Sequence, residues 1–118
     1  MGEEKPRKYD LEERTLQFAK RVAGFTKEVV KDIPNVEYSK QVIRSSGSVG
    51  ANYIEANESL SKRDFAMRIK ICRKEAKETR FWLQLMTCAD SNNLEKEQLI
   101  QESTELLKIF SAILSKSS

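Results

Sequence analysis

The chain contains no histidine, and this absence removes several kinds of active site at once. Without histidine, neither a Ser-His-Asp triad nor a Cys-His pair can form in its usual version, and the Glu-x-x-His iron sites of ferritin-like bundles are excluded as well. Two cysteines alone cannot complete a structural zinc site, and the sequence has no Gly-x-x-x-x-Gly-Lys phosphate-binding loop. The sequence therefore predicts a protein that is not an enzyme and that holds no metal and no cofactor.

Proline, glycine, cysteine and long apolar runs are also scarce. Only two prolines and four glycines interrupt the chain, which leaves room for long helices. No apolar run approaches the roughly 20 residues of a membrane span, and the N-terminus has no apolar stretch of the kind that marks a secretory signal. We place Cys72 and Cys88 in one helix, about 24 Å apart and too distant for a disulfide. We therefore expect both to be reduced thiols and the protein to be cytoplasmic.

Apolar residues recur at intervals of three and four in four separate segments, which is the spacing of amphipathic helices. The predicted helices begin at a capping box of Asp10 and Glu13, at about Val36, at the cap Ser61 and at Leu94. They end before Pro34, at about Glu58, at the turn over residues 90–93 and at about Leu114. Short links between them predict an all-α fold, an antiparallel up-down-up-down four-helix bundle. We expect one domain over residues 10–116, after a disordered N-terminal arm over residues 1–9.

The second predicted helix carries two adjoining apolar stripes, and many of their residues are small. One stripe is Val42, Ser46, Val49, Tyr53, Ala56 and Leu60, and the other is Ile43, Gly47, Gly50 and Ile54. Each glycine inside a helix costs up to about 1 kcal/mol relative to alanine. Gly47 and Gly50 therefore predict either the close approach of a neighbouring helix backbone or a kink or break between Ser45 and Ser48.

The third predicted helix also has apolar residues beyond its core stripe. Surplus apolar surface usually has a partner, and another copy of the same chain is the most common one. The alternative is a monomer that tolerates some exposed apolar side chains. The predicted oligomer interface comprises Gly47, Gly50, Tyr53, Ile54, Phe81, Trp82 and Leu85.

The net charge of +3 is unevenly distributed, because residues 62–80 hold eight basic and three acidic residues. Seven of the eight share roughly 120° of the helical wheel; we call them the basic arc: Lys62, Arg63, Lys70, Arg73, Lys74, Lys77 and Arg80. A row of cations on one rigid helix can neutralise phosphates and release counterions. The arc, with Lys5, Arg7 and Lys8 of the arm, is the candidate nucleic-acid-binding surface.

An alternative for the basic arc is a solvated face that pairs with acidic residues of the fourth helix, such as Glu102 and Glu105. The arc has no aromatic residue for base stacking, so any nucleic-acid binding should be mostly independent of sequence.

Two acidic motifs, Glu55-x-x-Glu58 and Glu75-x-x-Glu78, lie on consecutive predicted helices. Paired motifs of this kind bind Mg²⁺ in all-α nucleotide pyrophosphohydrolases. Lys74 and Lys77 would screen a metal beside the second motif, so we interpret these residues as solvated or salt-bridged glutamates. A Mg²⁺-dependent nucleotide hydrolase is accordingly the third of our hypotheses.

Two segments carry a family resemblance. Residues 39–56 (SKQVIRSSGSVGANYIEA) and 74–83 (KEAKETRFWL) resemble the second- and third-helix signatures of the four-helix-bundle proteins encoded in intervening sequences of bacterial 23S ribosomal RNA genes. The resemblance extends from Leu11 to about Leu114, although family members often have glycine at the position of Ala56. It implies a homopentamer around a central axis, and a distant relation to the accessory variability proteins of diversity-generating retroelements, which are basic pentamers implicated in nucleic-acid binding. It supplies no catalytic residue.

The leading hypothesis from the residues and the resemblance together is a non-enzymatic, homo-oligomeric accessory protein that binds RNA or another nucleic acid through the basic arc. The alternative is an oligomeric scaffold that binds a protein partner and no nucleic acid.

Overall fold

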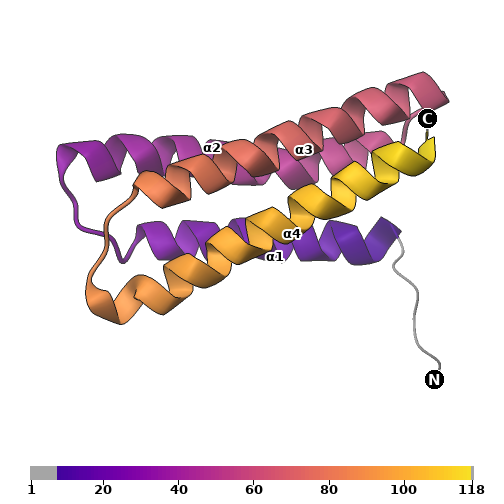
Figure 1. The fold of residues 1–118 in the computed structure, drawn as a ribbon. Helices are drawn as coiled ribbons and strands as arrows, with labels where there is room; N and C mark the ends of the chain where they lie inside the picture. Colours follow the sequence, from indigo (N-terminus) through magenta and orange to yellow (C-terminus); the bar gives the residue numbers. More distant parts are fainter. Residues whose placement is uncertain (1–7, 118) are drawn as a thin grey trace.

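The computed structural model describes residues 8–117, with side chains for residues 10–116. Four long helices and one short 3-10 helix follow one another: α1 (Lys8–Thr26), α2 (Ile33–Asn57), α3 (Lys62–Leu85), η1 (Asp90–Asn92) and α4 (Asn93–Ser117). Each helix runs back towards the end from which the preceding helix came (Figure 1). α1 packs against α2 and α4, and α3 packs against the same two helices from the opposite corner. The prediction of an all-α four-helix bundle is confirmed.

The predicted start of the first helix was wrong. α1 begins at Lys8, so Asp10 lies in its first turn and does not cap it. A carboxylate in this turn still faces the positive end of the helix dipole. Residues 1–7 of the predicted arm, which include Lys5 and Arg7, lie outside the described residues. The backbone of residues 8 and 9 belongs to α1, but the Lys8 side chain is also outside the described part.

The junction between α1 and α2 also differs from the prediction. α1 ends at Thr26, and α2 begins at Ile33, three residues before the expected start. Asp32 is the N-cap, because its side chain accepts a 2.9 Å hydrogen bond from the backbone N–H of Asn35. Pro34 lies in the first turn of α2, where a missing N–H has no cost. The proline therefore opens the second helix, whereas we had expected it to end the first.

The start of α3 is as predicted and its end is not. Ser61 caps the helix by accepting a 3.0 Å hydrogen bond from the backbone N–H of Asp64. α3 ends at Leu85, so Cys88 lies in the link to α4 and not in the same helix as Cys72. Both cysteines are free thiols, as expected. Burial raises the pKa of the Cys72 thiol to about 12.

The core lies along one predicted stripe of each of the four helices. Its buried apolar side chains are Phe18, Val22, Phe25, Val29, Val42, Val49, Tyr53, Ala56, Ile69, Cys72, Ala76, Leu83, Met86, Leu99, Leu106 and Phe110. Leu60, which we had placed in the stripe of the second helix, is an exception: it lies beyond the end of α2 and is 99% exposed. α2 is unbroken across residues 45–48, so the alternative of a break in this helix is wrong. The Ser45 hydroxyl shares a 2.8 Å hydrogen bond with Thr79 of α3, which satisfies a buried polar pair between the two helices.

The two glycines of α2 have different environments. A Cβ atom built at Gly50 would lie 2.9 Å from Thr15 Oγ1 of α1, so this glycine permits the close helix approach that we predicted. A Cβ atom at Gly47 would meet nothing within 4 Å. Only Gly50 is therefore explained by packing within one protomer.

Candidate nucleic-acid interface

The basic arc follows the side of α3 that faces α4 and the solvent. Five of its residues are exposed: Lys62, Arg63, Lys70, Lys74 and Lys77. Arg73 and Arg80 are half-buried, and Arg80 donates a 3.1 Å hydrogen bond to Thr104 Oγ1 of α4. The arc is thus built on one straight helix and partly supported by the neighbouring one.

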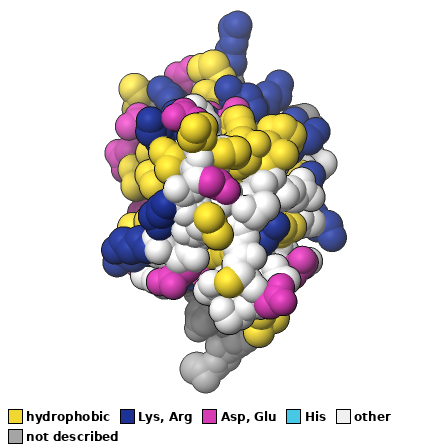
Figure 2. All heavy atoms as spheres, turned by 90° about the vertical axis from the view of Figure 1, so that its left-hand side faces the viewer, with side chains coloured by type: hydrophobic (Ala, Val, Ile, Leu, Met, Phe, Trp, Pro, Cys, Tyr) yellow, Lys and Arg dark blue, Asp and Glu magenta, His cyan; other side chains and the backbone are white. Residues whose placement is uncertain are grey.

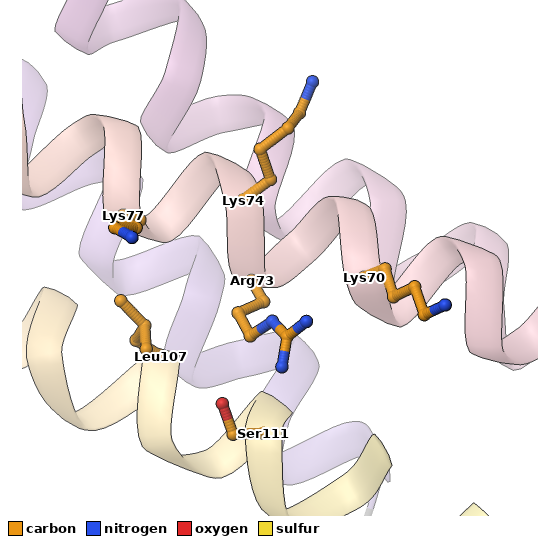
Figure 3. Close-up of a pocket in the computed structure, with 6 residues that line it drawn as sticks. All are labelled: Lys70, Arg73, Lys74, Lys77, Leu107 and Ser111. Carbon is orange, nitrogen blue, oxygen red and sulfur yellow. The ribbon is translucent and has the colours of Figure 1, made fainter. Parts of the chain in front are cut away.

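A pocket of about 440 Å³ opens between α3 and α4 in the middle of the arc. Four basic side chains of α3 and two neutral ones of α4 line it: Lys70, Arg73, Lys74, Lys77, Leu107 and Ser111. In Figure 3 the Arg73 guanidinium extends towards α4 and the Ser111 hydroxyl points back towards it, whereas Lys74 points away from α4. The pocket therefore has a strongly positive wall and contains no carboxylate.

Glu102 and Glu105 of α4 do not pair with the arc, so that part of our alternative was wrong. Arg14 of α1 holds both of them: it donates to Glu102 over 2.7 and 2.9 Å and to Glu105 over 2.9 Å. The hydrogen bond to Glu102 is the largest effect that raises the pKa of Arg14. Hydrogen bonds from Gln101 and Arg14 lower the pKa of Glu105. Both carboxylates are accordingly directed to the α1 side of α4.

Two acidic residues of α3, Glu75 and Glu78, are held on the side of α2. Arg44 of α2 pairs with Glu75 at 3.4 Å and also with Glu78. Glu75 is 7 % exposed, so an arginine partner offsets the cost of burying its charge. Within the described residues the only ion pair of the arc joins Lys74 to Glu75 across 3.9 Å. This pair is exposed on the lysine side and contributes little attraction.

Arg14 and Arg44 are the residues that sequence reasoning missed. Together they pair with four carboxylates of α3 and α4, and none of these carboxylates lines the pocket. Arg44 lies inside the segment that carries the family resemblance, which was the only signal in the sequence for it.

The acidic motifs do not form a metal site. No group of three or more potential ligands comes together within residues 10–116. Glu75 and Glu78 are salt-bridged, as we interpreted them. Glu55 is exposed on α2 and Glu58 is the C-cap residue of that helix. A Mg²⁺-dependent hydrolase therefore has no support in this arrangement.

Comparison with known proteins agrees with the resemblance. A family model described as "23S rRNA-intervening sequence protein" matches residues 7–114. The chain belongs to this family. A crystal structure of a protein of unknown function from the S23 ribosomal protein family of Bacteroides thetaiotaomicron has 33% sequence identity and a TM-score of 0.74, over 87% of this chain and 96% of that chain. No curated protein matches. Neither match indicates an enzyme family.

The protein has several apolar side chains on its surface. Figure 2 looks at the end of the bundle where α1 and α3 end and α2 and α4 begin, and shows hydrophobic side chains gathered there among charged ones. Near this end, Phe81 is 53% exposed and Leu85 39% exposed. Trp82 is half-buried between the rings of Phe81 and Tyr38, with centroid distances of 5.1 and 6.0 Å. Part of the predicted interface is thus accessible here.

The predicted interface residues of α2 divide into two groups. Ile54 is 49% exposed and Gly47 is exposed. Tyr53 is buried against Phe110, with ring centroids 6.2 Å apart, and Gly50 faces Thr15. The latter two residues contribute to packing within the protomer.

In residues 8–117 no helix is long and apolar enough to cross a membrane.

Proposed function

We propose that this intervening-sequence protein is a non-enzymatic RNA-binding accessory protein of the bacterial cytoplasm, assembled from five copies of the chain. The observation that carries the proposal is the pairing of Arg14 and Arg44 with the nearby carboxylates. Because these glutamates are occupied on the far sides of α3 and α4, the arc between them keeps its positive charge. A dense array of cations whose one ion pair, between Lys74 and Glu75, is long and largely exposed attracts a polyanion, and the released counterions favour binding.

The form of the arc suggests how RNA is bound. Its cations stand along a rigid helix, and the pocket wall offers Leu107 but no aromatic ring to stack on a base. Such a surface contacts the sugar-phosphate backbone, so binding should be nearly indifferent to sequence. If five copies surround a common axis, the arc repeats five times, and weak contacts at each copy add up to avidity.

Exposed apolar side chains support the assembly. Four residues of the proposed interface lie on the surface of a single protomer: Phe81, Leu85, Gly47 and Ile54. Exposing apolar side chains to water is unfavourable, and contact with another copy would remove that cost. Gly47 has space for a neighbouring backbone that nothing in its own chain occupies. We propose that these residues and Trp82 contact adjacent copies.

The test compares two triple variants that remove the same residue types from two parts of the chain. The arc variant is Arg73→Gln, Lys74→Gln and Lys77→Gln. The control variant is Lys20→Gln, Arg21→Gln and Lys27→Gln. All three residues are exposed; the first two lie on α1, the helix that does not contact α3, and the third directly follows it. In a mobility-shift titration with RNA at low salt, the arc variant should bind much more weakly than the wild type, and the control variant should bind nearly as well.

Light scattering on the same samples makes the result decisive. All three proteins should have the mass of one oligomer, five copies by our proposal. Wild-type protein that binds no RNA at low salt would exclude the proposal. Loss of the oligomer in the arc variant would show that the arc pairs between copies, and the exposed aromatic cluster around Trp82 would then favour the second candidate function, an oligomeric scaffold for a protein partner.

A further inference from the structure

The pocket between α3 and α4 has a feature beyond its charge: groups on opposite walls face one another. Arg73 comes from α3 and Ser111 from α4, and their polar ends point into the same space (Figure 3). Arg73 has no ion pair with any described residue, and the Ser111 hydroxyl has no hydrogen bond there either. Two donors on opposite walls define a position for one anion between them.

We propose that this pocket binds linked phosphate groups, with one phosphate held between Arg73 and Ser111 and its neighbours paired with Lys70 and Lys77. The inference rests on the proposed function in one respect, because it assigns the RNA backbone as the natural source of those phosphates. The two lysines are seven residues apart, so about 10 Å of helix axis separates them. That length suits a short run of linked phosphates with Arg73 near its middle.

The arrangement favours phosphate over carboxylate. A guanidinium fork binds two oxygens of either group. A tetrahedral phosphate has further oxygens on its opposite side, which can accept from Ser111 at the same time. A planar carboxylate that fills the fork turns its carbon chain towards the other wall, and so leaves the Ser111 hydroxyl without an acceptor. The four cations also match a ligand with several charges better than a single carboxylate.

Leu107 has a separate part in the pocket. Its side chain comes from α4 beside Ser111 and gives the wall an apolar area next to the cations. In an RNA backbone each phosphate is followed by a ribose, whose carbon atoms can pack on such an area. Free oligophosphate has no counterpart to the ribose, so RNA should gain from Leu107 and oligophosphate should not.

The experiment uses the full-length protein with inorganic tripolyphosphate as the probe, followed by calorimetry and by competition against labelled RNA. Tripolyphosphate should bind the wild type and displace RNA, and a poly-glutamate peptide of equal charge should do so much less well. Ser111→Ala should weaken tripolyphosphate binding by about ten- to hundredfold through one lost hydrogen bond to a charged group. Arg73→Lys should weaken it by about tenfold, because lysine keeps the charge but loses the fork.

The matched control is Arg21→Lys on the exposed side of α1, which should leave binding unchanged. If Ser111→Ala and Arg73→Lys bind like this control while RNA still binds, the pocket assignment is wrong and the proposed function stands. If tripolyphosphate binds with the expected pattern but RNA does not, the pocket takes free oligophosphate and the proposed function is wrong. Equal competition by poly-glutamate would overturn the choice of phosphate. Leu107→Ala should weaken RNA binding alone, and an equal loss for both ligands would refute its assigned role.

Discussion

Replacement of Gly50 by alanine tests a close contact between α1 and α2. The new Cβ would lie 2.9 Å from Thr15 Oγ1 and 3.3 Å from Thr15 Cβ. Thr15 is 1% exposed, and its hydroxyl donates to the carbonyl oxygens of Leu11 and Glu12 at 2.9 and 3.1 Å. It therefore cannot rotate away without losing those bonds, and α1 and α2 must separate to relieve the contact.

The expected magnitude follows from two opposing effects. Alanine in a helix interior is favoured over glycine by up to about 1 kcal/mol, whereas overfilling a packed contact costs about 1–3 kcal/mol. Gly47→Ala gains the first effect without the second, because no atom of the described residues lies within 4 Å of the added Cβ. We expect Gly50→Ala to be less stable than Gly47→Ala by about 1–3 kcal/mol. Gly24→Ala, also without neighbours and outside the proposed interface, controls for oligomer effects at Gly47.

Urea unfolding followed by circular dichroism measures these differences, at one protein concentration because assembly changes apparent stability. Combining Gly50→Ala with Thr15→Ala should recover part of the loss, since the nearest atom is then absent. Equal or greater stability of Gly50→Ala relative to both controls would show that the helices are not in close contact at this point. A Gly47→Ala protein less stable than Gly24→Ala would indicate that a neighbouring copy approaches Gly47.

Three further predictions concern other parts of the bundle. Asn35→Ala should lower the free energy of unfolding, measured in urea, by about 2–4 kcal/mol. The reason is that the buried Asn35 amide connects the α1–α2 link to the α3–α4 link by four hydrogen bonds. A loss of stability no larger than that of a surface variant would contradict this role. A thiol reagent at pH 8 should modify Cys88 and spare Cys72 until the protein unfolds, as mass spectrometry can check, since burial raises the pKa of Cys72 to about 12. Arg14→Gln should lower stability at neutral pH, and the difference from wild type should shrink as the pH falls below 4.5. The sign follows because a carboxylate with a lowered pKa, here Glu105, stabilises the fold only while it is ionised; a difference that grows in acid would refute it.

Periodicity was sufficient to predict the helices and their buried faces. On α3, the expected stripe from Ile69 to Met86 is buried, because a 3–4 spacing places its residues on one face whatever the neighbours are. The helix boundaries were harder. Pro34 disfavours helical geometry at the residue before it, yet it is also well suited to a first helical turn. Both effects are local, and the Asp32 cap decided between them.

The position of the basic arc along one helix was predictable, and its contacts with the other helices were not; its binding of nucleic acid stays a prediction. A helical wheel grouped the basic arc, since all its members lie on one helix. Whether Glu102 and Glu105 face the arc depends on the rotation of α4 about its axis, which packing against Arg14 and the core determines. Gly47 and Gly50 differ for the same reason: they are three residues apart, and only one of them is turned towards α1. Such relations between helices leave no periodic signal in the sequence.

The salt dependence of RNA affinity tests the central claim most directly, which is that the arc neutralises RNA phosphates. Fluorescence anisotropy with a labelled single-stranded RNA would give the slope of log K against log salt for the wild type and for the arc and control variants. Each phosphate contact on a single strand contributes about 0.7 to this slope. For the wild type we predict that log K falls linearly with log salt. The arc variant removes three contacts, so its slope should be smaller by about 2. The control variant should have the slope of the wild type. Equal slopes for the arc and control variants would contradict the account.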